Sequence, residues 1–332
     1  MHLPTDRLFG SERFGATTDS FCVSAEGALE LRSHGIGFTI GTSFDLSPVG
    51  TLSPQNLAVP LRSRRSAALL TQDQLSLLRQ AVTALYGIST QQINDERGYQ
   101  YWAGIHGLPT PMYCQNAHGT PYFLPWHRAY LYFFERALQD QVPDATLPWW
   151  DWAIPSGQAG MIPSAYSDEH DPAGQANALF SAEVNPAALQ QGKASGLVMA
   201  PKTLREPGQP GSLPLPKPDE IRVALGQPDY DHFRGAVEQL HNRVHVWVGG
   251  QDGHMGQIPF AAYDPIFWAH HTMIDRLWRI WQLQHPGANP DASLLDQALP
   301  PFRMTVRQTL DVTALGYDYA SSTSSQAVPA AT

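Results

Sequence analysis

The chain has 332 residues, of which 42% are hydrophobic and 15% are charged, so it is long enough to bury a large core. Its formal net charge is −9 at pH 7 and it has no basic cluster, which argues against a nucleic-acid partner. Two cysteines cannot build a disulfide framework, and no apolar run approaches the ~20 residues that span a bilayer. We therefore expect a globular protein that binds neither nucleic acid nor a membrane.

The first residues, "MHLPTDRLFG", lack the basic segment and the following apolar segment of a signal peptide. We therefore expect a cytoplasmic protein, although one exported by a separate carrier protein would have the same kind of sequence. The oligomeric state stays open.

The first third of the chain predicts strands followed by helices. Residues 1–60 combine weak alternation with glycine breaks, so we expect strands and turns that form an N-terminal extension packed on the core. Residues 70–88 have the apolar spacing of an amphipathic helix, with Thr71 as the expected N-cap. A shorter helix is expected over residues 94–106, because a glycine and a proline follow it.

Three further helices are expected in the rest of the chain. The third covers residues 124–142, and a long irregular region follows it from Pro148 to Glu220. The fourth helix covers residues 231–248, and the fifth begins at Pro265. Asp264, directly before this proline, is the expected N-cap of the fifth helix.

The C-terminal part predicts loops, a short strand in "MTVRQTLDV" at residues 304–312, and a flexible tail over residues 320–332. No linker divides the middle of the chain. We therefore expect one mainly helical domain over residues 60–319, built on a helical bundle with long loops and a few short peripheral strands.

Two histidines, His241 and His245, stand four residues apart on the apolar stripe of the fourth helix. This spacing points both rings in one direction. They can be core histidines bonded to carbonyl groups, but a pair at this spacing favours a metal, because both ring nitrogens reach one point. Asn242 stands where the zinc-protease pattern H-E-x-x-H requires its glutamate, which excludes that kind of protease.

Further histidines come from the other predicted helices, and no aspartate or glutamate occupies a comparable position. An all-imidazole set disfavours calcium, magnesium and a carboxylate-rich di-iron site, and it suits copper or zinc. Six ligands, three for each of two ions, are the natural count. The candidates besides the pair on the fourth helix are His106, His118, His127, His270 and His271.

Six segments occur in one order along residues 60–319: "HGLP", "AHGTPYFLPWHRAYLYFFE", "LHNRVHVWVGG", "GHMG", "DPIFWAHHTMIDRLW" and "GYDY". With these segments the chain resembles the type 3 copper proteins, which comprise tyrosinases, catechol oxidases and haemocyanin oxygen-binding units. The resemblance implies a four-helix bundle with a dinuclear copper site, and residues 60–319 as the tyrosinase-like catalytic domain. It implies two copper ions as cofactors: CuA, held by His106, His118 and His127, and CuB, held by His241, His245 and His271.

The choice of His271 over its neighbour rests on this resemblance, because the helix stripes of both residues could be buried. His270 is then expected to pack beside the ligands.

The resemblance also implies a reaction with phenolic small molecules, in which O2 is the co-substrate. Monophenols would be hydroxylated in the ortho position, and o-diphenols would be oxidised to o-quinones. The phenol must lose its proton, and its pKa near 10 makes this rare at neutral pH. Glu238 and Asn242 flank the His241/His245 stripe and could hold a water as the base, as is proposed for relatives. Otherwise Glu238 is a solvent-facing helix charge.

Further residues of the site follow from the resemblance. Ile258 occupies the place where plant-like catechol oxidases have a phenylalanine that shields CuB. Val246 would be a second wall of the substrate pocket, and Phe267 resembles the ring that packs over the site. Cys114 precedes His118 by four residues; relatives link a cysteine to this histidine by a thioether, but with a different spacing, so a free thiol is equally compatible.

The "GYDY" motif would supply a tyrosine, Tyr317 or Tyr319, that stacks on Arg64 or Arg65. The chain ends 13 residues after Tyr319, so no C-terminal plug domain is expected unless one has been removed. A tyrosinase is the leading hypothesis. The alternatives are a catechol oxidase or o-aminophenol oxidase without monophenolase activity, a haemocyanin-like O2 carrier, and a zinc-binding structural protein.

Overall fold

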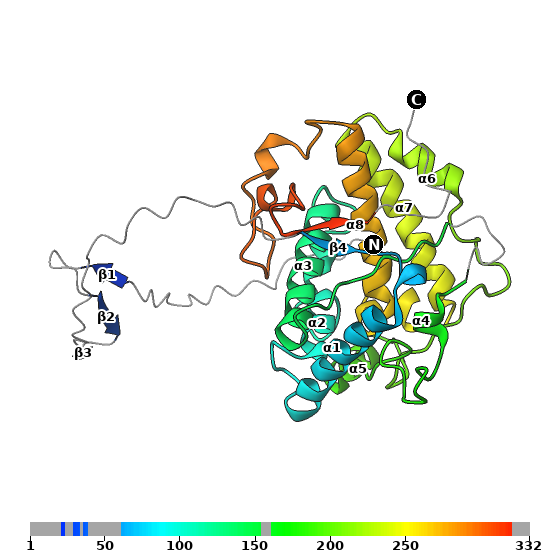
Figure 1. Cartoon of the computed structure of the whole chain (residues 1–332), viewed down its shortest axis with the longest axis horizontal. Coiled ribbons are helices and arrows are strands. Elements are labelled where there is room, and N and C mark those ends of the chain that lie inside the picture. Colours follow the sequence, from blue (N-terminus) through cyan, green and yellow to red (C-terminus); the bar gives the residue numbers. More distant parts are fainter. Residues whose placement is uncertain (1–20, 24–28, 34–35, 39–60, 154–160, 321–332) are drawn as a thin grey trace, which may run out of the picture. The chain divides into compact units, whose positions relative to one another are not determined.

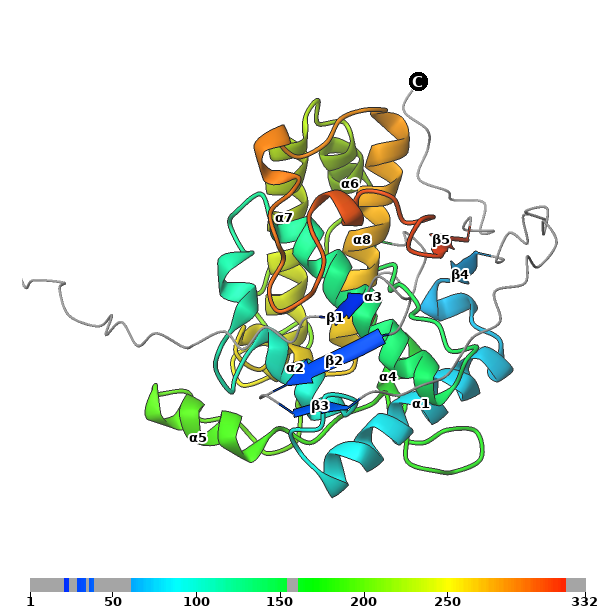
Figure 2. The ribbon, with the colours of Figure 1, turned by 90° about the vertical axis from the view of Figure 1, so that its left-hand side faces the viewer.

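A computed structural model of the chain describes residues 61–153 and 161–320, and the backbone of residues 21–23, 29–33 and 36–38. The chain divides into two compact units, residues 1–58 and 59–332. The first contains an antiparallel sheet of β1 (Phe21–Val23), β2 (Leu29–Ser33) and β3 (Ile36–Phe38), labelled in Figures 1 and 2. Strands are thus present where the sequence predicts them. The predicted packing of this extension and the predicted flexible tail lie outside the described residues.

The second unit is built on four helices, as the sequence predicts. α8 packs against both α3 and α7, and α2 lies beside α1, which also covers α3 (Figures 1 and 2). The core between them is rich in aromatic rings, such as Phe134 stacked on Trp268 with centroids 3.5 Å apart. The bundle helices are α2 (Tyr99–His106), α3 (Phe123–Gln141), α7 (Tyr230–Gly249) and α8 (Ile266–Gln284).

Helix α1 (Gln72–Gln91) begins at the predicted N-cap. The Gln74 backbone N–H donates to Thr71 Oγ1 over 3.2 Å, and the Thr71 N–H donates to Gln74 Oε1 over 3.0 Å. This capping box satisfies two N–H groups that a helix start leaves unpaired. α8 begins at Ile266, one residue later than predicted, and Pro265 rather than Asp264 is its N-cap. The Asp264 carboxylate still accepts the Ile266 N–H over 3.1 Å.

The region from Pro148 to Glu220, predicted as irregular, contains α4 (Ser164–Ser167), α5 (Pro186–Ala194) and the start of α6 (Pro218–Leu225). The prediction was therefore wrong at α5, although its start signals are present: Asn185 accepts the Ala187 N–H, and a proline follows the cap. Short 3-10 turns complete this unit, at Ala67–Leu69, Tyr113–Asn116, His254–Gly256, Ala261–Tyr263, Ala292–Leu294 and Arg307–Thr309.

The strand predicted within residues 304–312 is also wrong. The Val306 carbonyl accepts both the backbone N–H and the hydroxyl of Thr309, at 3.0 and 2.7 Å, which closes a 3-10 turn instead. Only an isolated bridge between Ala298 and Thr305 remains of extended pairing there.

The predicted arginine–tyrosine clasp is confirmed. β4 (Arg62–Arg64) pairs in parallel with β5 (Tyr317–Tyr319), and the Arg64 guanidinium lies 3.7 Å from the Tyr317 ring centroid. Arg64 is fully buried and pairs with Glu135 at 2.8 Å and with Asp275 at 3.1 Å. Because these carboxylates belong to α3 and α8, the clasp fastens the peripheral strands to two helices of the bundle.

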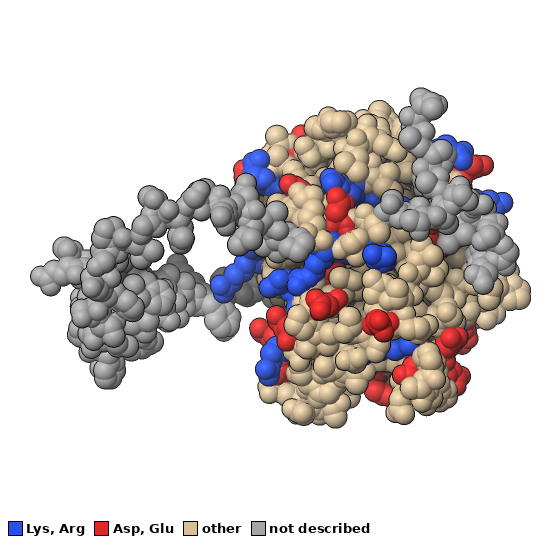
Figure 3. All heavy atoms as spheres, in the orientation of Figure 1, with Lys and Arg blue, Asp and Glu red and all other residues tan. Residues whose placement is uncertain are grey.

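The surface of this unit shows no large single-sign area on the face drawn in Figure 3, where basic and acidic side chains alternate. In the described part of the chain, no helix has both the length and the apolar character that crossing a bilayer requires.

Candidate metal centre

Two groups of histidines meet inside the bundle. In each group, one ring nitrogen per histidine lies within 4.8 Å of the corresponding nitrogens of the others. All but one of these side chains stand on helices, and His118 stands on the turn that leads into α3. The first group is His106, His118 and His127, and the second is His241, His245, His270 and His271.

In the second group three Nε2 atoms converge. His271 Nε2 lies 3.2 Å from His241 Nε2 and 3.3 Å from His245 Nε2. Ligands about 2 Å from a common ion, as imidazoles are in zinc sites, have nitrogens at about this separation. His270 instead stacks its ring on that of His241, with centroids 5.1 Å apart and planes inclined by 19°. The geometry therefore favours His271 over His270 as the third ligand.

The first group faces the second directly. Its three rings have centroids 5.2 to 5.8 Å apart. The rings of His127 and His271 stack across the two groups with centroids 4.4 Å apart. His118 approaches His241 to 5.6 Å between centroids. Two ions held by these groups would therefore be close neighbours, as a dinuclear site requires.

Hydrogen bonds fix the direction of three rings. His127 Nδ1 bonds the Phe123 carbonyl at 2.7 Å, and His245 Nδ1 bonds the Met255 carbonyl at 2.8 Å. His241 Nδ1 bonds the Asn242 side-chain oxygen at 3.0 Å. An oxygen of this kind only accepts, so Nδ1 carries the proton and the Nε2 lone pair is left for a metal.

Burial keeps these imidazoles neutral. It lowers the pKa of His118 and of His245 to about 4. The pKa values of His106, His127 and His271 fall well below 6.5, again through burial first and through neighbouring imidazoles second. A neutral imidazole is the form that binds a metal, so no proton has to be displaced at pH 7.

The residues fit two copper ions. Among the described residues, the Nε2 atoms of His106, His118 and His127 are buried and have no hydrogen-bond partner. A buried polar atom is rarely left unpaired, and a bound cation would supply the missing partner. Within the described part of the chain, both groups consist of histidines alone, without a carboxylate or a thiol. A donor set made only of imidazoles suits copper or zinc.

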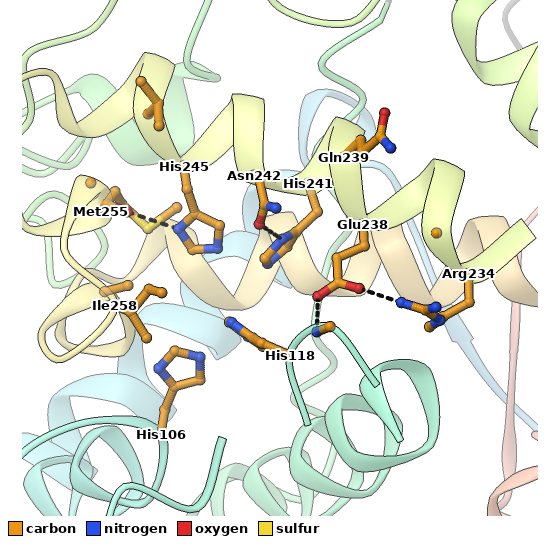
Figure 4. A pocket seen from close by; sticks show the side chains of 15 residues that line it. His106, His118, Arg234, Glu238, Gln239, His241, Asn242, His245, Met255 and Ile258 are labelled. Atoms are coloured by element: carbon orange, nitrogen blue, oxygen red, sulfur yellow. Dashed lines mark hydrogen bonds and ion pairs between the residues drawn. The ribbon is translucent and has the colours of Figure 1, made fainter. Parts of the chain in front are cut away.

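A pocket of about 640 Å³ opens beside both groups, with α7 as one wall (Figure 4). Val246 and Ile258 line it with exposed fractions of 54% and 49%, and their role as walls of a substrate pocket stays a prediction. Phe267 is fully buried and packs against the rings of His271 and His106, with centroids 4.1 and 4.7 Å away. It therefore supports the histidines and is not among the residues that line the pocket.

Glu238 lines the same pocket but is not a solvent-facing charge. Only 7% of the residue is exposed. One carboxylate oxygen accepts the Gly119 backbone N–H over 2.7 Å, and the other pairs with Arg234 at 2.8 Å (Figure 4). The sequence reasoning missed Arg234, although its spacing of four residues from Glu238 on a helix is the signal of such a pair. Asn242 also lines the pocket and is exposed.

Cys114 lies in the 3-10 turn before His118, whose N–H donates to the Cys114 carbonyl over 3.2 Å. Its thiol is free and fully buried, and burial raises its pKa to about 12. Such a thiol stays protonated at neutral pH. The thioether to His118 remains a prediction.

Comparisons with known proteins agree with this geometry. A family model described as the common central domain of tyrosinase matches residues 96–284. The tyrosinase of Streptomyces glaucescens is 33% identical over 267 residues, which cover 73% of this chain and 93% of that protein. A hemocyanin of Enteroctopus dofleini, "G-type, units Oda to Odg", is 30% identical over 75% of this chain, but the chain spans only 9% of its length.

Among solved structures, a functional unit of octopus hemocyanin superimposes with a TM-score of 0.61 and 27% identity. The match covers 77% of this chain and 67% of that unit. Proteins of this family bind two copper ions through histidines, as the two groups inside the bundle would. Sequence, fold and histidine geometry thus agree, and the chain belongs to the tyrosinase family of type 3 copper proteins.

Proposed function

We propose that the chain is a dicopper phenol oxidase of the tyrosinase type, which ortho-hydroxylates monophenols and oxidises o-diphenols to o-quinones with O2. Its copper ligands are His106, His118 and His127 for CuA, and His241, His245 and His271 for CuB. The observation that carries the proposal is the pocket beside both groups. When bound, the two copper ions supply the binding and activation of O2 and the electron transfer of the oxidation.

The pocket has the size and the position that a phenol requires. Its volume of about 640 Å³ lies in the range of pockets that hold organic molecules much larger than O2. His106, His118, His241 and His245 all line it, so a bound aromatic ring would lie against both groups. An O2 carrier gains nothing from such access, which argues against that alternative.

Glu238 and Asn242 are the candidates for proton removal. The Asn242 side-chain oxygen is occupied by His241, so its NH2 group remains free to donate to a water in the pocket. Each carboxylate oxygen of Glu238 keeps a second lone pair, and either one can accept a hydrogen bond from the water that Asn242 holds. A phenol proton would pass to this water and on to the carboxylate, which leaves the phenolate that hydroxylation uses.

One observation favours the alternative of a catechol oxidase or o-aminophenol oxidase. Both carboxylate oxygens of Glu238 are already engaged, one by Gly119 and one by Arg234. A carboxylate whose two oxygens are both engaged has less capacity left to receive a phenol proton, and o-diphenols lose their protons more easily than monophenols do.

Oxygen uptake by the copper-loaded chain with a monophenol and with a catechol separates these functions. For Glu238→Gln and Asn242→Ala we expect the monophenol rate to fall by roughly 10²- to 10⁴-fold while catechol oxidation is kept. Full monophenol rates in both variants would refute the base assignment. Catechol oxidation alone in the unmodified chain would identify the alternative, and reversible O2 binding without turnover would identify a carrier.

A further inference from the structure

His118 is held differently from the other proposed copper ligands. The others stand on α2, α3, α7 and α8, whereas His118 stands on the turn between the 3-10 helix Tyr113–Asn116 and α3. The backbone bonds around it are local: His118 N–H donates to Cys114, and Thr120 N–H donates to Ala117, each over 3.2 Å. Local bonds shape the turn, but they do not fix its distance from α7 across the pocket.

Two hydrogen bonds join α7 to this turn. The Tyr230 hydroxyl donates to the Pro121 carbonyl over 2.6 Å, at the start of α7. Glu238 accepts the N–H of Gly119, the residue directly after His118, over 2.7 Å. Figure 4 shows the Glu238 carboxylate between this turn and Arg234, whose guanidinium binds the second carboxylate oxygen at 2.8 Å. Gly119 has a φ of +71°, a conformation that glycine adopts without strain.

We propose that Arg234 and Glu238 form a clamp that positions His118 and so couples copper retention at CuA to the helix that carries two CuB ligands. The inference rests on the proposed function only in taking His118 as a copper ligand. A hydrogen bond to a charged acceptor is stronger than a neutral one, and both side chains of the clamp are largely shielded from water. Arg234 is a positioning residue here, because it acts on His118 through Glu238.

The clamp and the proposed base use the same carboxylate but can be separated by substitution. Glu238→Gln keeps an oxygen that accepts the Gly119 N–H, and it removes the charge that proton transfer needs. Glu238→Leu removes both. If Glu238 acts only as a base, the two variants lose monophenol oxidation equally and retain copper equally. If it also acts as a clamp, only the leucine variant releases His118.

Amide hydrogen exchange at Gly119 tests the clamp in the metal-free full-length chain. We expect slow exchange in the unmodified chain and exchange up to about tenfold faster in Glu238→Gln, whose amide keeps the Gly119 bond but cannot accept from Arg234. In Glu238→Leu we expect exchange roughly ten- to a hundredfold faster. Arg234→Met should also accelerate it, because the carboxylate loses the partner that holds it. Arg243→Met is the matched control: Arg243 lies on the same helix and pairs with Glu220 at 2.8 Å, so the Gly119 amide should be unaffected.

Copper content per chain, measured after dialysis against a chelator, tests the coupling. We expect two ions in the unmodified chain, in Glu238→Gln and in Arg243→Met, and about one in Glu238→Leu. Unchanged Gly119 exchange in Glu238→Leu and Arg234→Met would overturn the clamp, and faster exchange with two ions retained would overturn the coupling. Should the leucine variant not fold, the Gly119 exchange rate in Arg234→Met decides whether the clamp exists. Failure of the unmodified chain to oxidise any phenol would refute the proposed function and leave these results intact.

Discussion

Acidification of the metal-free protein should destabilise it through the buried imidazoles of the two histidine groups. Burial lowers the pKa of His118 and His245 from 6.5 to about 4. Below pH 6.5 the unfolded chain takes up protons on these imidazoles, while the folded chain does not until about pH 4. The free energy of unfolding therefore falls as the pH falls through this window, and it is unaffected by these groups above pH 7.

The size of the effect follows from the pKa values. At pH 5.5 each of the two imidazoles lowers the free energy of unfolding by about 1 to 2 kcal/mol, or roughly 3 kcal/mol together. The other histidines of the two groups also have pKa values well below 6.5. With them, the loss of unfolding free energy at pH 5.5 has an upper bound of roughly 10 kcal/mol, which is comparable with the whole stability of a domain. Carboxylates such as Asp275, whose pKa is lowered by Arg128 and Arg64 against the opposing effect of burial, lose their contribution only at more acidic pH.

Urea unfolding at pH 7.0 and pH 5.5 measures this loss. A variant with glutamine at both His118 and His245 should lose roughly 3 kcal/mol less than the unmodified metal-free chain over the same interval. Equal unfolding free energies of the unmodified chain at the two pH values would refute the reasoning, because they would mean that the imidazoles titrate normally in the folded state.

Three further predictions concern the pocket, the ligands and the clasp. Ile258→Phe should narrow the pocket mouth, so we expect a higher KM for bulky phenols in steady-state assays and a KM for small phenols within about twofold of the original. Equal changes of KM for bulky and small phenols would contradict this prediction. His271→Gln should lower the copper content from two ions to one, whereas His270→Gln should keep two by metal analysis. Arg64→Met should cost about 3–5 kcal/mol in urea unfolding, because it leaves the buried Glu135 carboxylate without its ion-pair partner and leaves Asp275 with Arg128 alone; a loss below about 1 kcal/mol would contradict this.

Features with local signals could be predicted from the sequence. The capping box at Thr71 involves residues three positions apart, and the His241/His245 stripe follows from helix periodicity alone. α5 carried similar signals at Asn185 but was missed, because it is short and lies in a region rich in proline and glycine. The 3-10 turn at Arg307–Thr309 was mistaken for a strand, because Val, Thr and Leu are typical of strands and the hydrogen bonds of Thr309 cannot be read from composition.

The copper-ligand histidines could be predicted because they stand in family motifs. Contacts between segments far apart in the sequence could not be predicted. The stripes of His270 and His271 are both buried, so only the Nε2 distances favour His271. Arg234 and Glu238 show the spacing of an ion pair, but the bond from Gly119 joins residues 119 positions apart. A contact of this kind depends on how α7 packs against the turn, which no local pattern contains.

The most direct test of the dinuclear centre is anomalous scattering at the copper edge from crystals of the copper-loaded chain. We predict two peaks per chain, one among the Nε2 atoms of His106, His118 and His127, and one among those of His241, His245 and His271. A single peak, or a second peak bound by His270 in place of His271, would contradict the assignment.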